Sequence, residues 1–447
     1  MRKLKILEKI SYGFGDLGNN VTFMSMAIFL LMFYTNYLKI SPIDAGIIFF
    51  VARIWDAFAD ITIGVIIDRR VQHPKYGKFR IFLLKASWPV LIMFILCFTA
   101  PHWSYTYRLL WAYITYIGWG TAYSLINIPY GSLASVMTNQ VGDRAALSVA
   151  RSLGSSIGGT LPQILIIPIV LMFHSTTLGW VVATLLLSII AGLSYLCAYK
   201  GTVEQVKSEN PKEKISIKDL LEIFKTNRPF WGVSIGSIAI VITFMLNGTL
   251  ALYYFKYDLH AEKFYGYNGL IGLVITLILA TVLVSFVKKK GARKLAIMGS
   301  LFCALAYAII LVLPSNIYLY LILFFVATFA YSLPNMLVWM MLSDSIEYAE
   351  WRTGKRNESV IYAAYSFMRK ISQALAGLIS GLGLGLIGYH VGEQMSGHVL
   401  QGIKFMTVGI PVIGMIVAAM AFLFIYNLTP NLYKKILIEL DQRRLEV

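Results

Sequence analysis

Long apolar segments alternate with short polar connectors along the whole 447-residue chain. A helix of about 20 residues rises 1.5 Å per residue and so crosses a hydrocarbon core of ~30 Å. The apolar segments reach this length, and the pattern therefore predicts membrane-spanning helices. Counting them gives twelve spans, with approximate cores at residues 12–38, 43–67, 81–100, 107–136, 147–173, 178–200, 229–255, 265–287, 294–313, 317–342, 358–388 and 402–427.

The twelve predicted spans divide into two halves of six. A polar segment separates the halves, and a basic connector follows the second span of each half. Two six-helix halves joined by a polar loop are the layout of a parallel-repeat transporter. We predict an all-α membrane protein with a six-helix bundle at residues 1–200, a cytoplasmic loop at 201–228, a second six-helix bundle at 229–427 and a cytoplasmic tail at 428–447.

Glycines recur at helical spacing in two of the spans. Gly377, Gly381 and Gly385 stand four residues apart, as do Gly154 and Gly158. Small residues at this spacing let helix backbones approach closely in lipid. We interpret both rows as packing surfaces, with a flexible hinge as the alternative.

Composition excludes a soluble protein. Hydrophobic residues make up 58% of the chain and charged residues only 14%, whereas a soluble domain carries roughly 25% charged residues. The three cysteines, Cys97, Cys197 and Cys303, each lie inside an apolar run and far from one another. They indicate small buried side chains, and we predict no metal site and no cofactor.

The formal net charge is +17, and the positions of the basic residues along the chain indicate its orientation in the membrane. Lys and Arg gather in the N-terminus, in every second connector and in the tail, whereas connectors such as 101–106, 174–179 and 314–317 contain neither. The positive-inside rule then places both termini and the central loop in the cytoplasm. We expect a multi-pass monomer in the cell (inner or plasma) membrane, with the lipid bilayer as its partner and no nucleic-acid partner.

The second span carries the most informative polar residues. Arg53, Asp56 and Asp60 have the spacing i, i+3 and i+7, so they share one helix face near the middle of the span. A charge at that depth costs about 2.5–3.5 kcal/mol on insertion scales. These side chains must therefore face the interior of the bundle. The pattern favours a proton or cation site in which the two carboxylates share one ion, and a structural ion-pair cluster is the alternative.

Other intramembrane cations are candidate partners for these acids or for a substrate. Arg151 opens the fifth span, and Arg369 and Lys370 lie within the eleventh. One of the three is expected to face Asp56 or Asp60, and another to donate hydrogen bonds to a substrate. Snorkelling or backbone pairing is the alternative for Arg369.

Uncharged polar residues indicate the kind of substrate. Asn19 and Asn20 lie in the first span, and Asn127 lies in the fourth; amides both donate and accept hydrogen bonds and suit a neutral polyol. Trp119 lies far from the ends of the fourth span and is the best candidate for stacking on a sugar ring. Most other Tyr and Trp residues are explained by contact with lipid and by interfacial belts.

Charged connectors on the cytoplasmic side are candidate gates. A mixed-charge segment closes the tenth span and could form ion pairs with the basic loops, although a solvated turn is the alternative. Single exposed pairs contribute less than ~1 kcal/mol, so a gate requires a network. The predicted gating residues are Asp68, Arg69, Lys78, Arg80, Asp344, Glu347 and Arg352.

Several motifs together resemble those of the glycoside–pentoside–hexuronide cation symporters of the major facilitator superfamily. The resemblance runs nearly from end to end. Its motifs are Lys9-Ile-Ser-Tyr-Gly-Phe-Gly-Asp16-Leu-Gly-Asn-Asn20, Arg53-Ile-Trp-Asp56-Ala-Phe-Ala-Asp60, Gly77-Lys-Phe-Arg80, Asn127-Ile-Pro-Tyr-Gly-Ser132, Glu347-Tyr348 and Arg369-Lys370.

The resemblance implies a major facilitator fold and cation-coupled sugar transport. By analogy with the melibiose branch, Asp56 and Asp60 match the acids that take the cation, and Ser124 matches a contributing hydroxyl. Ala59 replaces an Asn beside the second acid, which favours H⁺ over Na⁺ as the coupling ion. Among substrate positions, Trp119, Arg151 and Lys370 match, whereas Asn20 and Asn127 replace two sugar-binding acids and Gly131 replaces a tryptophan.

The runs Asn127-Ile-Pro-Tyr-Gly-Ser-Leu-Ala134 and Phe367-Met-Arg-Lys370 are more similar to the glucuronide and isoprimeverose/xyloside branch. Loss of the two acids fits an anionic glucuronide and equally a neutral xyloside. We therefore predict a non-enzymatic symporter that imports a glycoside with H⁺ by alternating access. An Na⁺-coupled sugar symporter of the same fold is the alternative. Remote alternatives are a membrane prenyltransferase that uses Asp56 and Asp60 as a metal site and a sensor that keeps the transporter fold.

Overall fold

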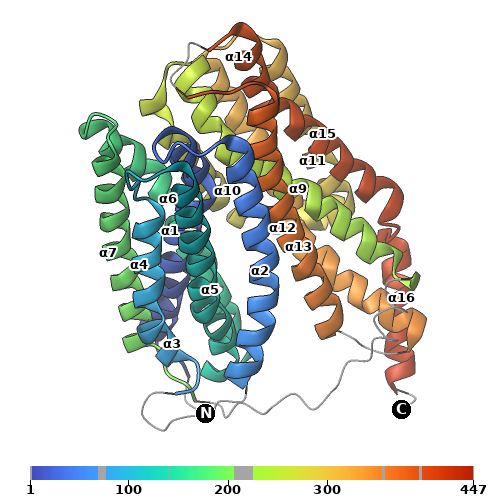
Figure 1. Cartoon of the computed structure of the whole chain (residues 1–447). Coiled ribbons are helices and arrows are strands. Elements are labelled where there is room, and N and C mark those ends of the chain that lie inside the picture. Colours follow the sequence, from blue (N-terminus) through green and yellow to red (C-terminus); the bar gives the residue numbers. More distant parts are fainter. Residues whose placement is uncertain are drawn as a thin grey trace. The chain divides into compact units, whose positions relative to one another are not determined.

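The structure is a computed structural model of the whole chain (Figure 1). It describes residues 3–68, 77–138, 140–205, 225–354, 358–391 and 395–445. Every regular element in these ranges is a helix. The predicted all-α fold class is therefore confirmed.

The helices follow one another with short connections. They are α1 (Ile6–Asn36), α2 (Pro42–Asp68), α3 (Arg80–Lys85), α4 (Ser87–Cys97), α5 (Tyr105–Met137), α6 (Val141–Met172), α7 (Thr177–Gly201), α9 (Arg228–Tyr253), η1 (Tyr254–Asp258), η2 (Glu262–Phe264), α10 (Gly266–Lys290), α11 (Ala292–Val312), α12 (Ile317–Thr353), α13 (Glu358–Leu386), α14 (Gly397–Lys404), η3 (Phe405–Gly409), α15 (Ile410–Met420), η4 (Ala421–Ile425) and α16 (Pro430–Leu445).

Nine helices in the described ranges are long and apolar enough to cross a membrane. Three further predicted spans, α2, α5 and α13, are helices of 27, 33 and 29 residues. Of the charges that the sequence singles out, α2 holds Arg53, Asp56 and Asp60, and α13 holds Arg369 and Lys370, while α5 holds Trp119, Ser124 and Asn127. The count of twelve spans stays a prediction, and these three helices carry most of the candidate chemistry.

The chain forms two compact units. The first contains Met1–Pro211, Phe255–Leu273 and Gly377–Val399, and the second contains the segments Lys212–Tyr254, Val274–Ala376 and Leu400–Val447. Helices α10 and α13 each contribute to both units. Residues 206–224, most of the predicted central loop, lie outside the described residues, so the predicted boundary at 201–228 stays a prediction.

In the first unit α1 packs along α6 and α7, and α2 packs along α5 (Figure 1). Glycines allow the close approach of α1 and α6. A methyl group on Gly154 would overlap the carbonyl of Gly13, and one on Gly158 would overlap the backbone of Leu17. The predicted packing role of the Gly154–Gly158 pair is confirmed.

The glycine row of α13 packs against α2 in the same unit. A methyl group on Gly381 would overlap Gly46 and the carbonyl of Pro42, and one on Gly377 would press on the side chain of Phe49. Gly385 lies against Ile43 in the same way. The predicted packing surface on this helix is also confirmed.

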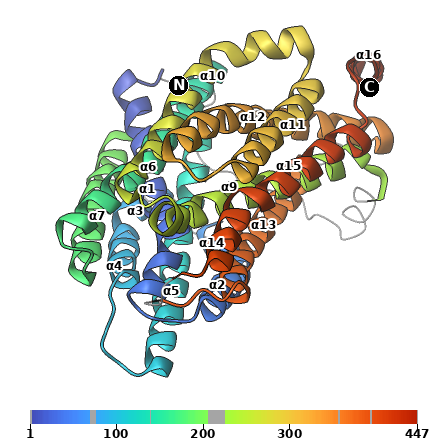
Figure 2. The ribbon, with the colours of Figure 1, turned by 90° about the horizontal axis from the view of Figure 1, so that it is seen from above.

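In the second unit α9 lies beside α15, and α11 lies beside α12 (Figure 2). The C-terminal helix α16 docks on α12 through polar side chains. The indole Nε1 of Trp351 donates to Glu439 at 2.6 Å, and the Tyr433 hydroxyl donates to Glu347 at 2.5 Å. The hydrogen bond from Trp351 lowers the pKa of the Glu439 carboxyl.

Candidate functional site

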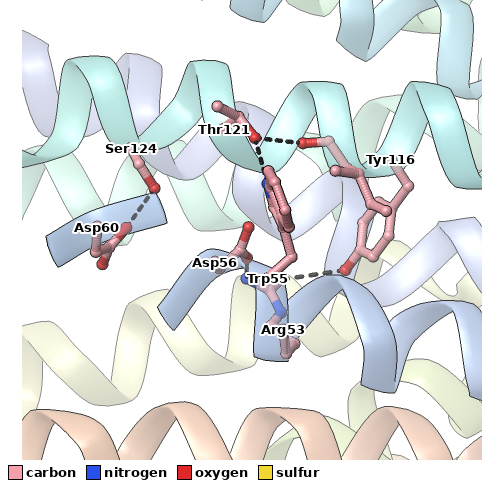
Figure 3. Close-up of polar contacts among 8 residues, drawn as sticks. Arg53, Trp55, Asp56, Asp60, Tyr116, Thr121 and Ser124 are labelled. Carbon is pink, nitrogen blue, oxygen red and sulfur yellow. Dashed lines mark hydrogen bonds and ion pairs between the residues drawn. The ribbon is translucent and has the colours of Figure 1, made fainter. Parts of the chain in front are cut away.

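The charged stripe of α2 faces α5 (Figure 3). Helical spacing brings Arg53 and Asp56 together, and Nη1 of Arg53 lies 3.0 Å from Oδ2 of Asp56. The side chains of this pair are only 12% and 9% exposed. Two opposite charges removed from water together avoid the larger cost of one unpaired buried charge. The pair is therefore a charge-compensated unit inside the helix packing.

Aromatic groups hold the other side of the Arg53 guanidinium. Its Nη2 atom donates to the Tyr116 hydroxyl on α5 at 3.2 Å (Figure 3). The guanidinium also lies over the ring of Phe23, 5.4 Å from its centroid, so α1 contributes a cation–π contact. Arg53 thus contacts side chains of α1, α5 and its own helix α2.

Asp60 lies two turns beyond Arg53 and has a different environment. Its Oδ1 atom accepts a hydrogen bond of 2.5 Å from the hydroxyl of Ser124 on α5 (Figure 3). Ser124 is buried, and Asp60 is half-buried. A hydroxyl can donate to a carboxylate and can accept from a carboxylic acid. This contact is therefore compatible with both protonation states of Asp60.

Gly120 gives Asp56 room against α5. A methyl group built on Gly120 would overlap the Asp56 carboxylate. Trp55, next to Asp56, instead lies half-exposed at the edge of the helix pair, where its Nε1 donates to the hydroxyl of Thr121 at 2.9 Å (Figure 3). Because Gly120 has no side chain, the backbone of α5 lies directly against the Asp56 carboxylate.

Trp119, the predicted sugar-stacking residue, is enclosed by aromatic rings. It is 1% exposed and stacks with Tyr116 and Tyr123, with ring centroids 5.9 and 5.2 Å away. Tyr123 is half-buried and therefore more exposed than Trp119. The sugar-binding role of Trp119 stays a prediction, and the structure adds Tyr123 to the same aromatic stack.

A second polar cluster surrounds Arg151 on α6. Its Nε atom lies 2.8 Å from Oδ2 of Asp16 on α1, and its guanidinium lies over the ring of Tyr130 on α5. Sequence reasoning expected one of three cations, Arg151 among them, to face Asp56 or Asp60, and it did not single out Asp16. The sequence did contain a signal for Asp16, because this carboxylate lies four residues before Asn20 and so on the same face of the first span.

The two amides of α1 differ in their contacts. Asn19 is fully buried and accepts a hydrogen bond from the Tyr195 hydroxyl of α7 at 3.1 Å. Asn20 is half-buried, and its Nδ2 donates to the backbone carbonyl of Asp16 at 2.9 Å. Asn19 therefore joins two helices, whereas Asn20 retains an amide oxygen for other contacts. On α5, Asn127 is also half-buried.

The cations of α13 lie in the second unit. Arg369 lies over the ring of Trp339, 5.2 Å from its centroid. The Arg369 charge therefore lies against an aromatic face, which attracts a cation. Lys370, the next residue in the sequence, is half-buried. The predicted substrate role of Lys370 stays a prediction.

The first group of predicted gating residues centres on Glu204, which sequence reasoning missed. Its carboxylate accepts hydrogen bonds from the backbone N–H groups of Lys78, Phe79 and Arg80 at 2.7–2.9 Å, at the start of α3. Nη1 of Arg80 also donates to the carbonyl of Thr202. Asp68 ends α2, and Arg69 lies outside the described residues.

The second group of predicted gating residues bonds to tyrosines of its own unit. Asp344 accepts from the Tyr426 hydroxyl at 3.0 Å, and Glu347 accepts from Tyr433. Arg352 lies over the ring of Trp351, 5.7 Å from its centroid. The two tyrosine contacts join the C-terminal segment to α12, and a gating role for the three residues stays a prediction.

A bundle of long apolar helices with buried, paired charges and half-buried amides defines a polytopic membrane transporter. A family model described as MFS/sugar transport protein matches residues 11–430. The chain belongs to this family, and its resemblance to the glycoside–pentoside–hexuronide symporters is confirmed.

Curated relatives match over almost their whole length. The glucuronide carrier protein homolog of Escherichia coli is 31% identical over 97% of this chain and 95% of its own. The isoprimeverose transporter of Lactiplantibacillus pentosus is 30% identical over 98% of this chain and 91% of its own. A solved inward-facing bacterial homolog of the lysosomal transporter Spinster matches the fold, with a TM-score of 0.66 and 13% identity over 94% and 95% of the two chains.

These matches settle the class of protein. The chain is a multi-pass sugar symporter of the major facilitator superfamily, and it is not an enzyme. The remote alternative of a membrane prenyltransferase was wrong. The Asp56 and Asp60 side chains that suggested it have separate partners, Arg53 and Ser124.

Proposed function

We propose that the chain couples the import of a glycoside to protons and that Asp56 and Asp60 carry the proton. The observation that carries this proposal is the pair of carboxylates on one face of α2. Asp56 is compensated by Arg53, whereas Asp60 contacts the neutral hydroxyl of Ser124. The Ser124 hydroxyl can donate to the Asp60 carboxylate or accept from the carboxylic acid, so this contact is possible in both protonation states. We therefore assign the exchange of the proton to Asp60.

The residues near Asp60 support H⁺ over Na⁺. A hard metal cation is held by several oxygen ligands. Position 59, adjacent to Asp60, is an alanine and offers no side-chain oxygen. Ser124 supplies a single hydroxyl, which is sufficient for a proton-carrying acid. An Na⁺ site would need further oxygens from elsewhere in the chain.

The substrate is a glucuronide, a xyloside or a similar di- or oligosaccharide. Half-buried amides at Asn20 and Asn127 suit sugar hydroxyls because they both donate and accept hydrogen bonds. Their neutrality also removes the charge that would repel an anionic sugar. The names of the two relatives, a glucuronide carrier homolog and an isoprimeverose transporter, support this substrate class.

The membrane potential supplies the driving force in this mechanism. One charge moving through 100 mV gains ~2.3 kcal/mol. At ~1.4 kcal/mol for each factor of ten, this free energy supports roughly fifty-fold accumulation of a neutral sugar. The transport cycle is alternating access, in a monomer in the cell membrane.

Replacing Asp60 by Asn tests the proposal. The unaltered protein should accumulate a radiolabelled glycoside in membrane vesicles when an inward proton gradient is imposed. Asp60→Asn should abolish accumulation above equilibrium, because Asn cannot take up a proton, while sugar exchange without a gradient continues. Asp44→Asn is the matched control, since Asp44 lies in the first turn of the same helix and bonds to Ser41.

Two results of that experiment would contradict the proposal. Full proton-driven accumulation by Asp60→Asn would remove Asp60 as the proton carrier. Accumulation that needs an Na⁺ gradient and ignores a proton gradient would replace H⁺ by Na⁺. A panel of glucuronides and xylosides, each measured with and without Na⁺, identifies the sugar in the same vesicles.

A further inference from the structure

Asp16 is a buried carboxylate that the proposed proton pathway does not use. It lies on α1 and is 6% exposed, and its Oδ2 atom lies 2.8 Å from Nε of Arg151 on α6. A carboxylate within a membrane span is costly unless it has a role or a partner. We propose that Asp16 is a positioning residue, which holds the Arg151 guanidinium so that its terminal nitrogens bind the sugar.

The geometry of the guanidinium supports this role. The group is planar, so a hydrogen bond at Nε also fixes the plane and direction of Nη1 and Nη2. Asp16 occupies the Nε side, while 44% of the Arg151 side chain remains exposed. A ligand that approaches Arg151 therefore meets a group whose orientation is already set, which lowers the entropy cost of binding.

Tyr130 fixes the guanidinium from a second direction. Its ring lies beneath Arg151, 5.5 Å from the guanidinium carbon to the ring centroid. Tyr130 is in turn held by α1, because it stacks on Tyr12 at 4.7 Å and donates to the Tyr12 carbonyl at 2.8 Å. Helices α1, α5 and α6 thus all contribute to the position of one side chain.

The cluster lies beside the amides that are proposed to bind the sugar. Asn20 is one helical turn from Asp16 and donates to its backbone carbonyl. Asn127 is three residues before Tyr130 and so lies on the same face of α5. The inference rests on the proposed function, because Asp16 acts through Arg151 only if a sugar binds here.

The role proposed for Asp16 and Arg151 differs from simple electrostatic attraction of an anionic sugar, because the charges of the two side chains compensate each other. Asp16 neutralises Arg151, so the pair offers directed N–H donors without net charge. Asp16→Asn keeps the shape of the side chain but loses the ionic hydrogen bond. We expect the half-saturating sugar concentration to rise about tenfold or more, with the maximal exchange rate within about twofold of the unaltered protein.

The test is counterflow in proteoliposomes without a proton gradient, so that proton coupling does not enter the measurement. The probes are 4-nitrophenyl β-D-glucuronide and methyl β-D-xyloside. Asp16→Glu, which keeps the carboxylate, should recover part of the affinity. Asp143→Asn is the matched control, because Asp143 on α6 forms a similar ion pair of 2.8 Å with Lys9, and its half-saturating concentration should not change.

A double variant guards against misfolding of Asp16→Asn. Asp16→Asn combined with Arg151→Gln leaves no unpaired charge in the cluster. If Asp16 acts through Arg151, this double variant and Arg151→Gln alone have the same half-saturating concentration. A further tenfold loss in the double variant would overturn the inference, because it would show an effect of Asp16 that does not depend on Arg151.

The outcomes separate this inference from the proposed function. Unchanged affinity in Asp16→Asn, with normal counterflow by the unaltered protein, would overturn the inference alone. Failure of the unaltered protein to exchange either probe would overturn the proposed substrate class together with the inference. Proton-driven accumulation by Asp60→Asn would overturn the proposed coupling and leave the counterflow result for Asp16 standing.

Discussion

Asp56 occupies a point on α2 where the facing helix has no side chain. Gly120 of α5 lies directly against its carboxylate, and Arg53 compensates its charge. Tyr116, one turn before Gly120 on α5, accepts a hydrogen bond from the same Arg53. The exact position of the acid therefore depends on one missing methyl group.

Gly120→Ala should displace Asp56 and disturb its ion pair. Alanine is the better helix former by about 1 kcal/mol, so any loss arises from the clash and not from the helix itself. We expect proton-driven uptake to fall about tenfold or more, equivalent to ~1.4 kcal/mol, in vesicle assays. Gly64→Ala on α2 is the control, because a methyl group there meets open space. Equal uptake by the two variants would contradict the role assigned to Gly120.

At the scale of elements, the contact of α1 with α6 decides where Arg151 meets Asp16. Gly154 and Gly158, about one turn apart, bring the two backbones together. Without a hydrophobic driving force between helices in lipid, such close van der Waals packing is a main source of association. The polar cluster is thus supported by the glycine contact one turn away.

Gly158→Ala should weaken this packing, whereas Gly159→Ala should not. A methyl group on Gly158 would overlap the Leu17 backbone, while one on Gly159 makes an ordinary contact with Met24. Overpacking of this kind costs typically about 1–3 kcal/mol. Thermal unfolding of the detergent-solubilised protein should show a lower midpoint for Gly158→Ala alone. A lower midpoint for both variants would indicate a general effect of alanine in this helix.

At the scale of the whole molecule, the distribution of Lys and Arg sets the orientation in the membrane. Basic residues cluster at the N-terminus, after the second and eighth predicted spans and in the tail. Glu204 adds a structural element on the same predicted side, where it caps the start of α3. We propose from this pattern that both termini lie in the cytoplasm.

Reporter fusions test the orientation. Green fluorescent protein fused after residue 447 should fluoresce, because it folds in the cytoplasm, and alkaline phosphatase at the same place should be inactive. Phosphatase inserted in the bare connector at residues 101–106 should be active. Phosphatase activity at both places would contradict the twelve-span topology. Nine spans are predicted between residue 106 and the C-terminus, and two sites on the same side of the membrane require an even number between them.

The sequence by itself determined the helical class, the family and the charged face of α2. Each of these follows from local information. A run of about 20 apolar residues predicts a membrane-spanning helix. The spacing of Arg53, Asp56 and Asp60 fixes their common helix face. The glycine rows of α6 and α13 were predictable for the same reason. Their partners, Gly13 and Gly46, were not, since the sequence alone does not say which helix a face meets.

Only the tertiary structure decided which groups pair across helices. Arg151 meets Asp16, and Glu204 meets the start of α3, because helix rotation and register bring residues distant in sequence into contact. Trp119 likewise became part of an enclosed aromatic stack once α1 and α5 packed together. Hydrogen bonds and ion pairs act over a few ångströms, so small shifts in helix packing determine which polar groups become partners. The periodicity of the sequence does not contain this information.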